Sequence, residues 1–169
     1  MGAISGGSKV ARALIKALMN SKVLITIKFN NDLNFKSDPG DYSMHNITLY
    51  SKTDSELLSS TFVHELTHAL TDVNGFDAAI TDVFFNDKDK QAIKRKYQEA
   101  TAITVEQQFR KDMGYEERDT QKYGGIGVNG YAQFTNEYTN AAEKDLEGVD
   151  TMNFNRGQGI VAYLISISR

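Results

Sequence analysis

Residues 53–75 read TDSELLSSTFVHELTHALTDVNG, and this stretch decides how the rest of the chain is interpreted. It opens with Thr53-Asp54-Ser55-Glu56, which has the pattern of an N-terminal capping box. It ends at Asn74-Gly75, residues that commonly terminate a helix. The sequence therefore predicts one helix that runs from the capping box to about Val73.

Inside this predicted helix lies His64-Glu65-Leu66-Thr67-His68, an HExxH pentapeptide. Residues four apart in a helix lie about 40° apart around its axis and one turn along, so both imidazoles can reach one metal ion. Glu65 lies on the near side, where its carboxylate can act as a general base on a metal-activated water. Imidazole and carboxylate ligands with one open position are typical of a hydrolytic zinc centre. We therefore expect one Zn²⁺ per chain, held by His64 and His68.

A catalytic zinc ion normally has three protein ligands, so the third is sought among the remaining residues. Cysteine is absent and His45 is the only other histidine, which leaves a carboxylate unless His45 folds over the site. Glu106 and Glu99 are the leading candidates, because residues seven apart share one face of a continuous helix. The reserves are three aspartates, Asp72, Asp77 and Asp82. Asp72, one turn beyond His68, is equally interpreted as a hydrogen-bond partner of a ligating histidine or as an exposed acid.

The rest of the chain predicts an α+β fold with one domain. Helices are expected over residues 9–20 and 88–113. The second helix should stop at Gly114, and it is either continuous or broken near Thr104. Strands are expected over 23–29 and 46–50, and a loop over 30–42. We expect a small, mostly antiparallel sheet packed against the HExxH helix and further helices. Residues 1–8 are interpreted as a flexible lead and residues 9–169 as the domain.

Composition narrows the classes of function. The chain has 169 residues, 40% of them hydrophobic and 24% charged, and its net charge is −3. This balance gives no overall attraction to nucleic acid, so we expect none as a partner. No apolar run approaches the ~20 residues that span a bilayer, and no signal peptide is visible, so we expect a water-soluble chain.

Two resemblances to known families add to this interpretation. VHELTHALTD, residues 63–72, resembles the active-site helix of thermolysin-type peptidases. Residues 23–123 resemble more broadly the compact bacterial effector and polymorphic-toxin zinc peptidases typified by NleD. That resemblance is carried by Ile47-Thr48-Leu49, the HELTHA motif, Glu106-Gln107-Gln108-Phe109-Arg110, Gly114, Arg118 and Tyr123. It implies a zincin fold, and it favours Glu106 over Glu99 as the glutamate ligand.

The resemblance also implies a function. We expect a zinc-dependent endopeptidase that cuts a protein substrate, secreted or delivered into a target cell as an effector or as a toxin domain with an immunity or chaperone partner. The tetrahedral oxyanion would be stabilised by a tyrosine, with Tyr123 the first choice, by an arginine, or by His45. Two rival interpretations stay open. The first is a broad-specificity, thermolysin-like degradative peptidase, and the second is a binding or structural domain in which HExxH is catalytically silent.

Overall fold

The computed structural model describes residues 7–31, 40–50, 54–73 and 88–118. Within them the elements are, in chain order, α2 (Lys9–Asn20), β1 (Thr26–Asn30), β2 (Gly40–Ser43), β3 (Asn46–Tyr50), α3 (Ser55–Val73) and α5 (Lys88–Met113). The architecture is α+β, as the sequence predicts. In this part of the chain, none of the helices combines the length and the apolar character that a membrane crossing requires.

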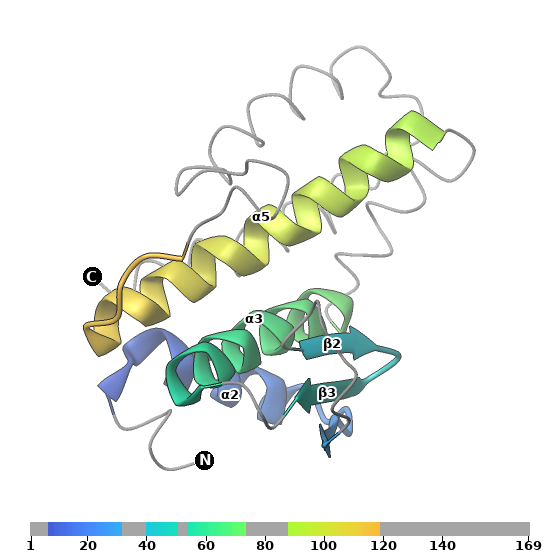
Figure 1. Ribbon diagram of the computed structural model, residues 1–169. Coiled ribbons are helices and arrows are strands. Elements are labelled where there is room, and N and C mark those ends of the chain that lie inside the picture. Colours follow the sequence, from blue (N-terminus) through green and yellow to red (C-terminus); the bar gives the residue numbers. More distant parts are fainter. Residues whose placement is uncertain (1–6, 32–39, 51–53, 74–87, 119–169) are drawn as a thin grey trace.

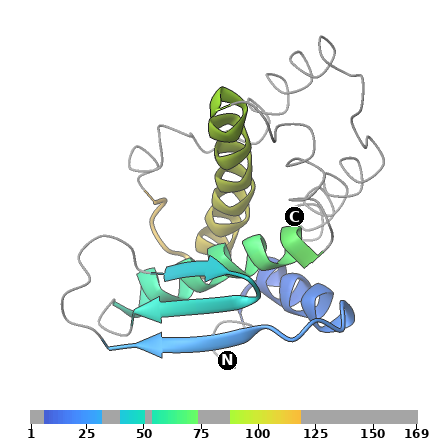
Figure 2. The same cartoon turned by 90° about the vertical axis from the view of Figure 1, so that its right-hand side faces the viewer.

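Helix α3 is the central element. It lies between α5 on one side and the sheet on the other, and it also contacts α2 (Figures 1 and 2). Residues 60–67 and 69–71 are all buried, so the helix is enclosed around its whole circumference over about three turns. A helix buried on every side has no solvent face for its polar residues. The buried polar side chains of HExxH therefore sit inside the packed molecule.

The hydrophobic core forms around α3. Four elements contribute apolar side chains to it: Val10, Ala11, Leu14 and Leu18 from α2, Ile47 and Leu49 from β3, Phe62, Val63, Leu66, Ala69 and Leu70 from α3, and Val105 and Phe109 from α5. The burial pattern of β3 alternates, with Ile47 and Leu49 facing the core, as expected for a strand with one buried face. This core holds α3 rigidly between α5 and the sheet.

The sheet is mixed, which corrects the expectation of a mostly antiparallel one. Its strand order is β1-β3-β2, with β3 parallel to β1 and antiparallel to β2 (Figure 2). A tight turn at Met44 and His45 joins β2 to β3, and both residues have positive φ, as the two-residue turns of twisted hairpins require. The hairpin makes that pair antiparallel, whereas β1 joins the opposite edge of β3 in the parallel sense.

Three of the four residues of strand β2 fall inside the segment that the sequence predicts to be a loop. Gly40 and Asp41 follow Pro39 and have little strand propensity, so the pairing of β2 with β3 comes from the tertiary fold. Strand β1 begins at Thr26 rather than at Val23, and its Phe29 side chain is 64% exposed. The strand over 46–50 and the helix over 9–20 are confirmed.

The helix termini differ in detail from the predicted ones. Helix α3 is capped by Asp54, whose carboxylate accepts a hydrogen bond from the Leu57 N–H. Thr53, the first residue of the predicted capping box, lies outside the described residues. Ser8, assigned by sequence to the flexible lead, is fully buried and caps α2 by accepting from the Ala11 N–H. The ordered structure therefore includes Ser8. Helix α5 is continuous through Thr104 and ends before Gly114, which has a φ of 72°.

Candidate metal centre

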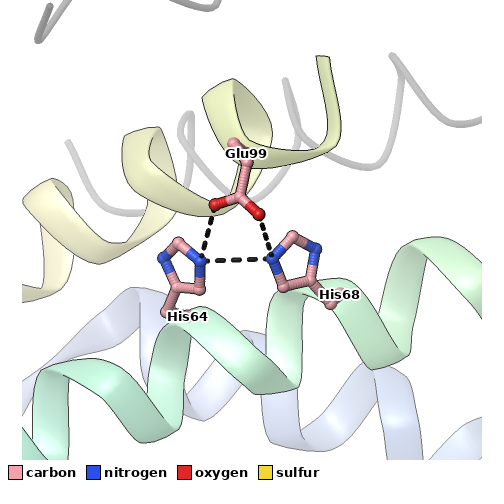
Figure 3. Close-up of side chains that lie close together, drawn as sticks. All are labelled: His64, His68 and Glu99. Atoms are coloured by element: carbon pink, nitrogen blue, oxygen red, sulfur yellow. Dashed lines mark hydrogen bonds and ion pairs between the residues drawn. The ribbon is translucent and has the colours of Figure 1, made fainter. Parts of the chain in front are cut away.

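Three side chains from two helices converge between α3 and α5. His64 and His68 point from α3, and Glu99 reaches down from α5 over both rings (Figure 3). The two histidine Nε2 atoms are 3.1 Å apart. Glu99 Oε2 lies 3.3 Å from His64 Nε2, and Glu99 Oε1 lies 3.8 Å from His68 Nε2. These are the only three residues with metal-ligating side chains that come together in this way within the described ranges.

The separations fit a divalent metal ion. Ligands at about 2.1 Å from a tetrahedral zinc ion lie about 3.4 Å from one another, and the three measured separations lie around that length. Two imidazoles and one carboxylate also form the ligand set of a well-known class of hydrolytic zinc sites. The group could hold other divalent ions as well, because nitrogen and oxygen ligands also suit several transition metals.

Local structure explains why the two rings meet. One helical turn separates His64 from His68, so their side chains project from the same face of α3. The rings stand edge to face, with centroids 4.8 Å apart and planes at 75°. His64 is only 4% exposed. A polar group buried this deeply needs partners, and the neighbouring glutamates of α5 supply them.

Glu106, predicted as the third metal ligand, lies on the other side of His64. Its Oε2 is 3.0 Å from His64 Nδ1, the ring nitrogen that points away from His68 and Glu99. Both of its oxygens also contact Arg118 Nη1, at 2.8 and 2.9 Å. Glu99 and Glu106 share a face of a continuous helix, as predicted, but two turns separate them by about 10 Å along the axis. Only one can reach the two Nε2 atoms, and it is Glu99.

The electrostatics of the site favour a positive charge on His64 itself. Burial lowers the pKa of His64, but hydrogen bonds with Glu106 and Glu99 and the charges of the carboxylates raise it to about 10. Burial and the charge on His64 lower the pKa of His68 to about 3, against a smaller opposing effect of Glu99. Burial raises the pKa of Glu106, whereas His64 and Arg118 lower it below its ordinary value. Without a metal, one proton on His64 therefore supplies the positive charge that the carboxylates require.

Glu65, the predicted general base, is buried on α3 beside the start of β2. A Cβ atom added at Gly40 would lie 2.6 Å from Thr61 Cγ2 and 3.3 Å from Glu65 Cγ. The glycine therefore allows the backbone of β2 to pack closely against this face of α3. This packing holds the Glu65 side chain against β2, an edge strand of the sheet. In the sequence, Glu65 directly follows His64 and precedes His68 by three residues.

Of the other predicted residues, Asp72 and His45 contact each other rather than the centre. Asp72 accepts a hydrogen bond from the Tyr42 hydroxyl, and its Oδ2 lies 3.6 Å from His45 Nε2. Among the described residues this is where Asp72 bonds, rather than to a ring proton of His68. His45 lies in the β2–β3 turn with a side chain 48% exposed. Three further candidates lie outside the described residues: Asp77, Asp82 and Tyr123.

Sequence reasoning missed the residues that fix α5 against α3. Arg110 donates from Nη1 to Ser60 Oγ and pairs through Nη2 with the Glu56 carboxylate. Glu56, predicted as part of a capping box, thus forms an interhelical ion pair. The signal in the sequence was the run Glu106-Gln107-Gln108-Phe109-Arg110, which the family resemblance placed at the site. It could not show which residue of the run does which task.

Comparisons with known proteins give no match from which a role for this centre could be taken. No family model matches the sequence, and no curated protein or solved structure matches it either.

Proposed function

We propose that this protein is a zinc-dependent endopeptidase with a zincin-like fold, in which His64, His68 and Glu99 hold the metal. One observation carries the proposal: two Nε2 atoms and a carboxylate converge at ligand separations beside a buried glutamate of the same HExxH helix. A buried histidine pair with a shared acid also occurs as a structural cluster, but Glu65, directly after the first histidine, has the position of the general base in the HExxH motif of metallopeptidases.

The residues divide the chemistry among them. When bound, a zinc ion acts as a Lewis acid and lowers the pKa of water toward ~7. Glu65 takes a proton from the attacking water as the general base and delivers it to the leaving amine as the general acid. The peptide C–N bond breaks, and the products are a carboxylate and an amine. Burial of Glu65 at 7% exposure keeps competing water away from the proton transfer.

The substrate side of the proposal rests on the resemblance to bacterial effector and toxin peptidases. We propose a protein substrate that is cut at few, defined sites after the enzyme is secreted or delivered into a target cell. Incubation with unfolded casein and with a cell extract, followed by identification of the new chain ends, tests this. A few defined cuts support an effector, whereas extensive digestion of casein indicates a degradative peptidase.

The Glu65→Gln variant tests the catalytic proposal. Elemental analysis of purified wild-type protein should find one zinc ion per chain. Glu65→Gln should keep that ion while hydrolysis falls by about 10²–10⁴-fold, because the amide cannot accept a proton. Glu117→Gln, an exposed glutamate, is the matched control and should leave both unchanged. A wild-type protein that binds no zinc after reconstitution, or full activity in Glu65→Gln, would contradict the proposal.

A further inference from the structure

Behind the proposed metal ligands lies a buried chain of charged groups that leads away from the centre. His64 Nδ1 is 3.0 Å from Glu106 Oε2, and Arg118 Nη1 is 2.8 and 2.9 Å from the two oxygens of Glu106. We infer that Glu106 and Arg118 are positioning residues that act through His64 and set its affinity for the metal. This inference rests on the proposed metal site, and it assigns a role to two buried or partly buried residues of the site that are not ligands.

The contact with Glu106 fixes which nitrogen of His64 faces the metal. A neutral imidazole carries its proton on one nitrogen and a lone pair on the other. With Nδ1–H donating to Glu106, the lone pair of Nε2 points toward His68 and Glu99, which lie on that side. A carboxylate partner also makes a ligating imidazole more basic and locks its ring orientation. Glu106 is 1% exposed, so this hydrogen bond has no competition from bulk water.

Arg118 makes the buried charge of Glu106 tolerable. A carboxylate without a counter-ion in such a site would take up a proton or be destabilised by desolvation. The Arg118 guanidinium is a cation and contacts both oxygens of Glu106. Glu106 is therefore an anionic acceptor for His64, with its oxygens already in use. This explains why Glu106 contributes no ligand although it touches the same ring.

The chain after α5 is built to bring Arg118 to this place. At the helix end the Tyr115 N–H donates to the Arg110 carbonyl and the Gly114 N–H to the Lys111 carbonyl, which is a Schellman motif that reverses the chain. Gln107 then holds the returning segment, because its amide accepts from the Arg118 N–H and donates to the Arg118 carbonyl.

Arg110 adds a third bond to the returning segment, from its Nε to the Glu116 carbonyl. An ordinary surface ion pair does not need hydrogen bonds that fix the backbone of its arginine. The hydrogen bonds here hold the Arg118 backbone against Gln107, the residue after Glu106 on α5. The backbone of residues 116 and 118 thus supports the proposed metal site by holding Arg118 in place, although it supplies no ligand.

Zinc affinity in a set of matched variants tests this inference. The protein is stripped with a chelator and titrated with Zn²⁺ against a chromophoric competitor. Arg118→Met should weaken zinc binding about 10–100-fold, as is typical when the partner of a ligating histidine is disturbed. Arg118→Lys should recover part of the loss, and Glu117→Gln, the neighbouring exposed acid, should bind as the wild type does.

A double-mutant cycle separates a relay from two independent effects. Glu106→Gln keeps the shape of the side chain and should weaken zinc binding to a similar extent. If Arg118 acts only through Glu106, then Arg118→Met should add less than a threefold loss in the Glu106→Gln background. The visible spectrum of bound Co²⁺ gives a second readout, which should change in Arg118→Met because the ring of His64 is reoriented.

The outcomes distinguish this inference from the proposed function. If the wild type binds no zinc, the metal site itself is wrong. If the wild type binds zinc tightly and Arg118→Met binds it within twofold, with an unchanged Co²⁺ spectrum, the positioning role is wrong and the metal site stands. Should Arg118→Met fail to fold, Gln107→Ala removes only the bonds to the Arg118 backbone. It should weaken zinc binding at least threefold, and an unchanged affinity would overturn the inference.

Discussion

Glu99 and Glu106 are two copies of one residue type on one face of one helix, and each contacts one nitrogen of the same imidazole ring. Their surroundings differ. The Glu99 side chain is 26% exposed and is shared between His64 and His68, whereas the Glu106 side chain is 1% exposed and is paired with Arg118. Counter-ion and burial therefore separate the two roles, and helix position alone does not.

The difference teaches how a ligand is distinguished from its support. A metal ion supplies positive charge, so a carboxylate whose two oxygens already contact an arginine gains less from binding it. Glu99 faces the imidazole nitrogens that carry lone pairs in the metal-bound state, and a cation placed between them satisfies all three groups. Variants that change one glutamate at a time test whether the two residues differ in this way.

The largest expected effect is on metal binding by Glu99→Ala. Removing a ligand should weaken zinc binding by more than about 1,000-fold, beyond the 10–100-fold expected for a supporting residue such as Glu106. Competition with a chromophoric chelator measures both variants. If Glu106→Ala loses the ion completely and Glu99→Ala keeps it, the two assignments are reversed.

Folding stability should rank the same two residues in the opposite order. Glu106→Ala leaves Arg118 and His64 without their buried partner and should cost about 3 kcal/mol, at the lower end for a broken buried pair because Arg118 is 14% exposed. Glu99→Ala, at a partly exposed position, should cost less than about 1 kcal/mol. Urea unfolding of the chelator-treated proteins measures both. Equal losses would mean that burial does not separate the two sites.

Glu106 should also influence the change of folding stability with pH more strongly than Glu99 does. The pKa of His64 is raised from 6.5 to about 10, so its contribution is complete below pH 6.5 and is lost as the pH rises toward 10. The pKa of His68 is lowered to about 3, so its contribution is present above pH 6.5 and is lost as the pH falls. The lowered pKa of Glu106 adds to the loss on the acid side.

The metal-free protein should therefore be most stable near pH 6.5, with a decline toward alkaline pH of up to about 1.4 kcal/mol per unit. Glu106→Gln should flatten that alkaline decline more than Glu99→Gln, because the hydrogen bond with Glu106 is the larger of the two influences that raise the pKa of His64. Urea titrations between pH 6 and 9 provide the measurement. A wild-type protein whose stability rises above pH 7 would contradict this prediction.

These contrasts show what could be read from the sequence. The HExxH helix, the helix over 88–113 and its stop at Gly114 are local patterns of caps and periodicity, and the structure has all three. The pairing of His64 with His68 follows from the same helical geometry. Periodicity also placed Glu99 and Glu106 on one face, but it could not show at which turn α5 crosses α3. The choice of ligand depends on that crossing, which is a property of tertiary packing.

The sheet also shows that local sequence patterns do not reveal contacts that come from tertiary packing. Strand β3 alternates apolar and polar residues, so its sequence predicted it, whereas β2 pairs with it in spite of a glycine and an aspartate among its four residues. The turn at Met44 and His45 lacks the Asn-Gly signal of a two-residue hairpin, although both residues have positive φ. No local pattern therefore marked the strand that packs against Glu65.

Gly40→Ala is expected to perturb Glu65, the proposed general base, without changing either glutamate of α5. The new Cβ would lie 2.6 Å from Thr61 Cγ2, so β2 must move, and the variant should lose about 2 kcal/mol of stability and part of its hydrolytic rate. Zinc affinity should stay within threefold, because the ligands lie on α3 and α5. Thr61→Ser removes the clashing methyl group, so the double variant should regain most of the stability. Unchanged stability in Gly40→Ala would contradict the close packing of β2.

Gly114→Ala is expected to have the smallest effect, because it changes only the turn that returns Arg118 to Glu106. Gly114 has a φ of 72°, and a Cβ there would meet nothing within 4 Å, so the cost is the conformational one of about 1 kcal/mol. Gly114→Asn should cost less, since asparagine tolerates this conformation. Zinc affinity should fall no more than threefold, because Gln107 and Arg110 still hold residues 115–118. A larger loss of zinc affinity than of stability would mean that the turn, and not these side chains, aims Arg118.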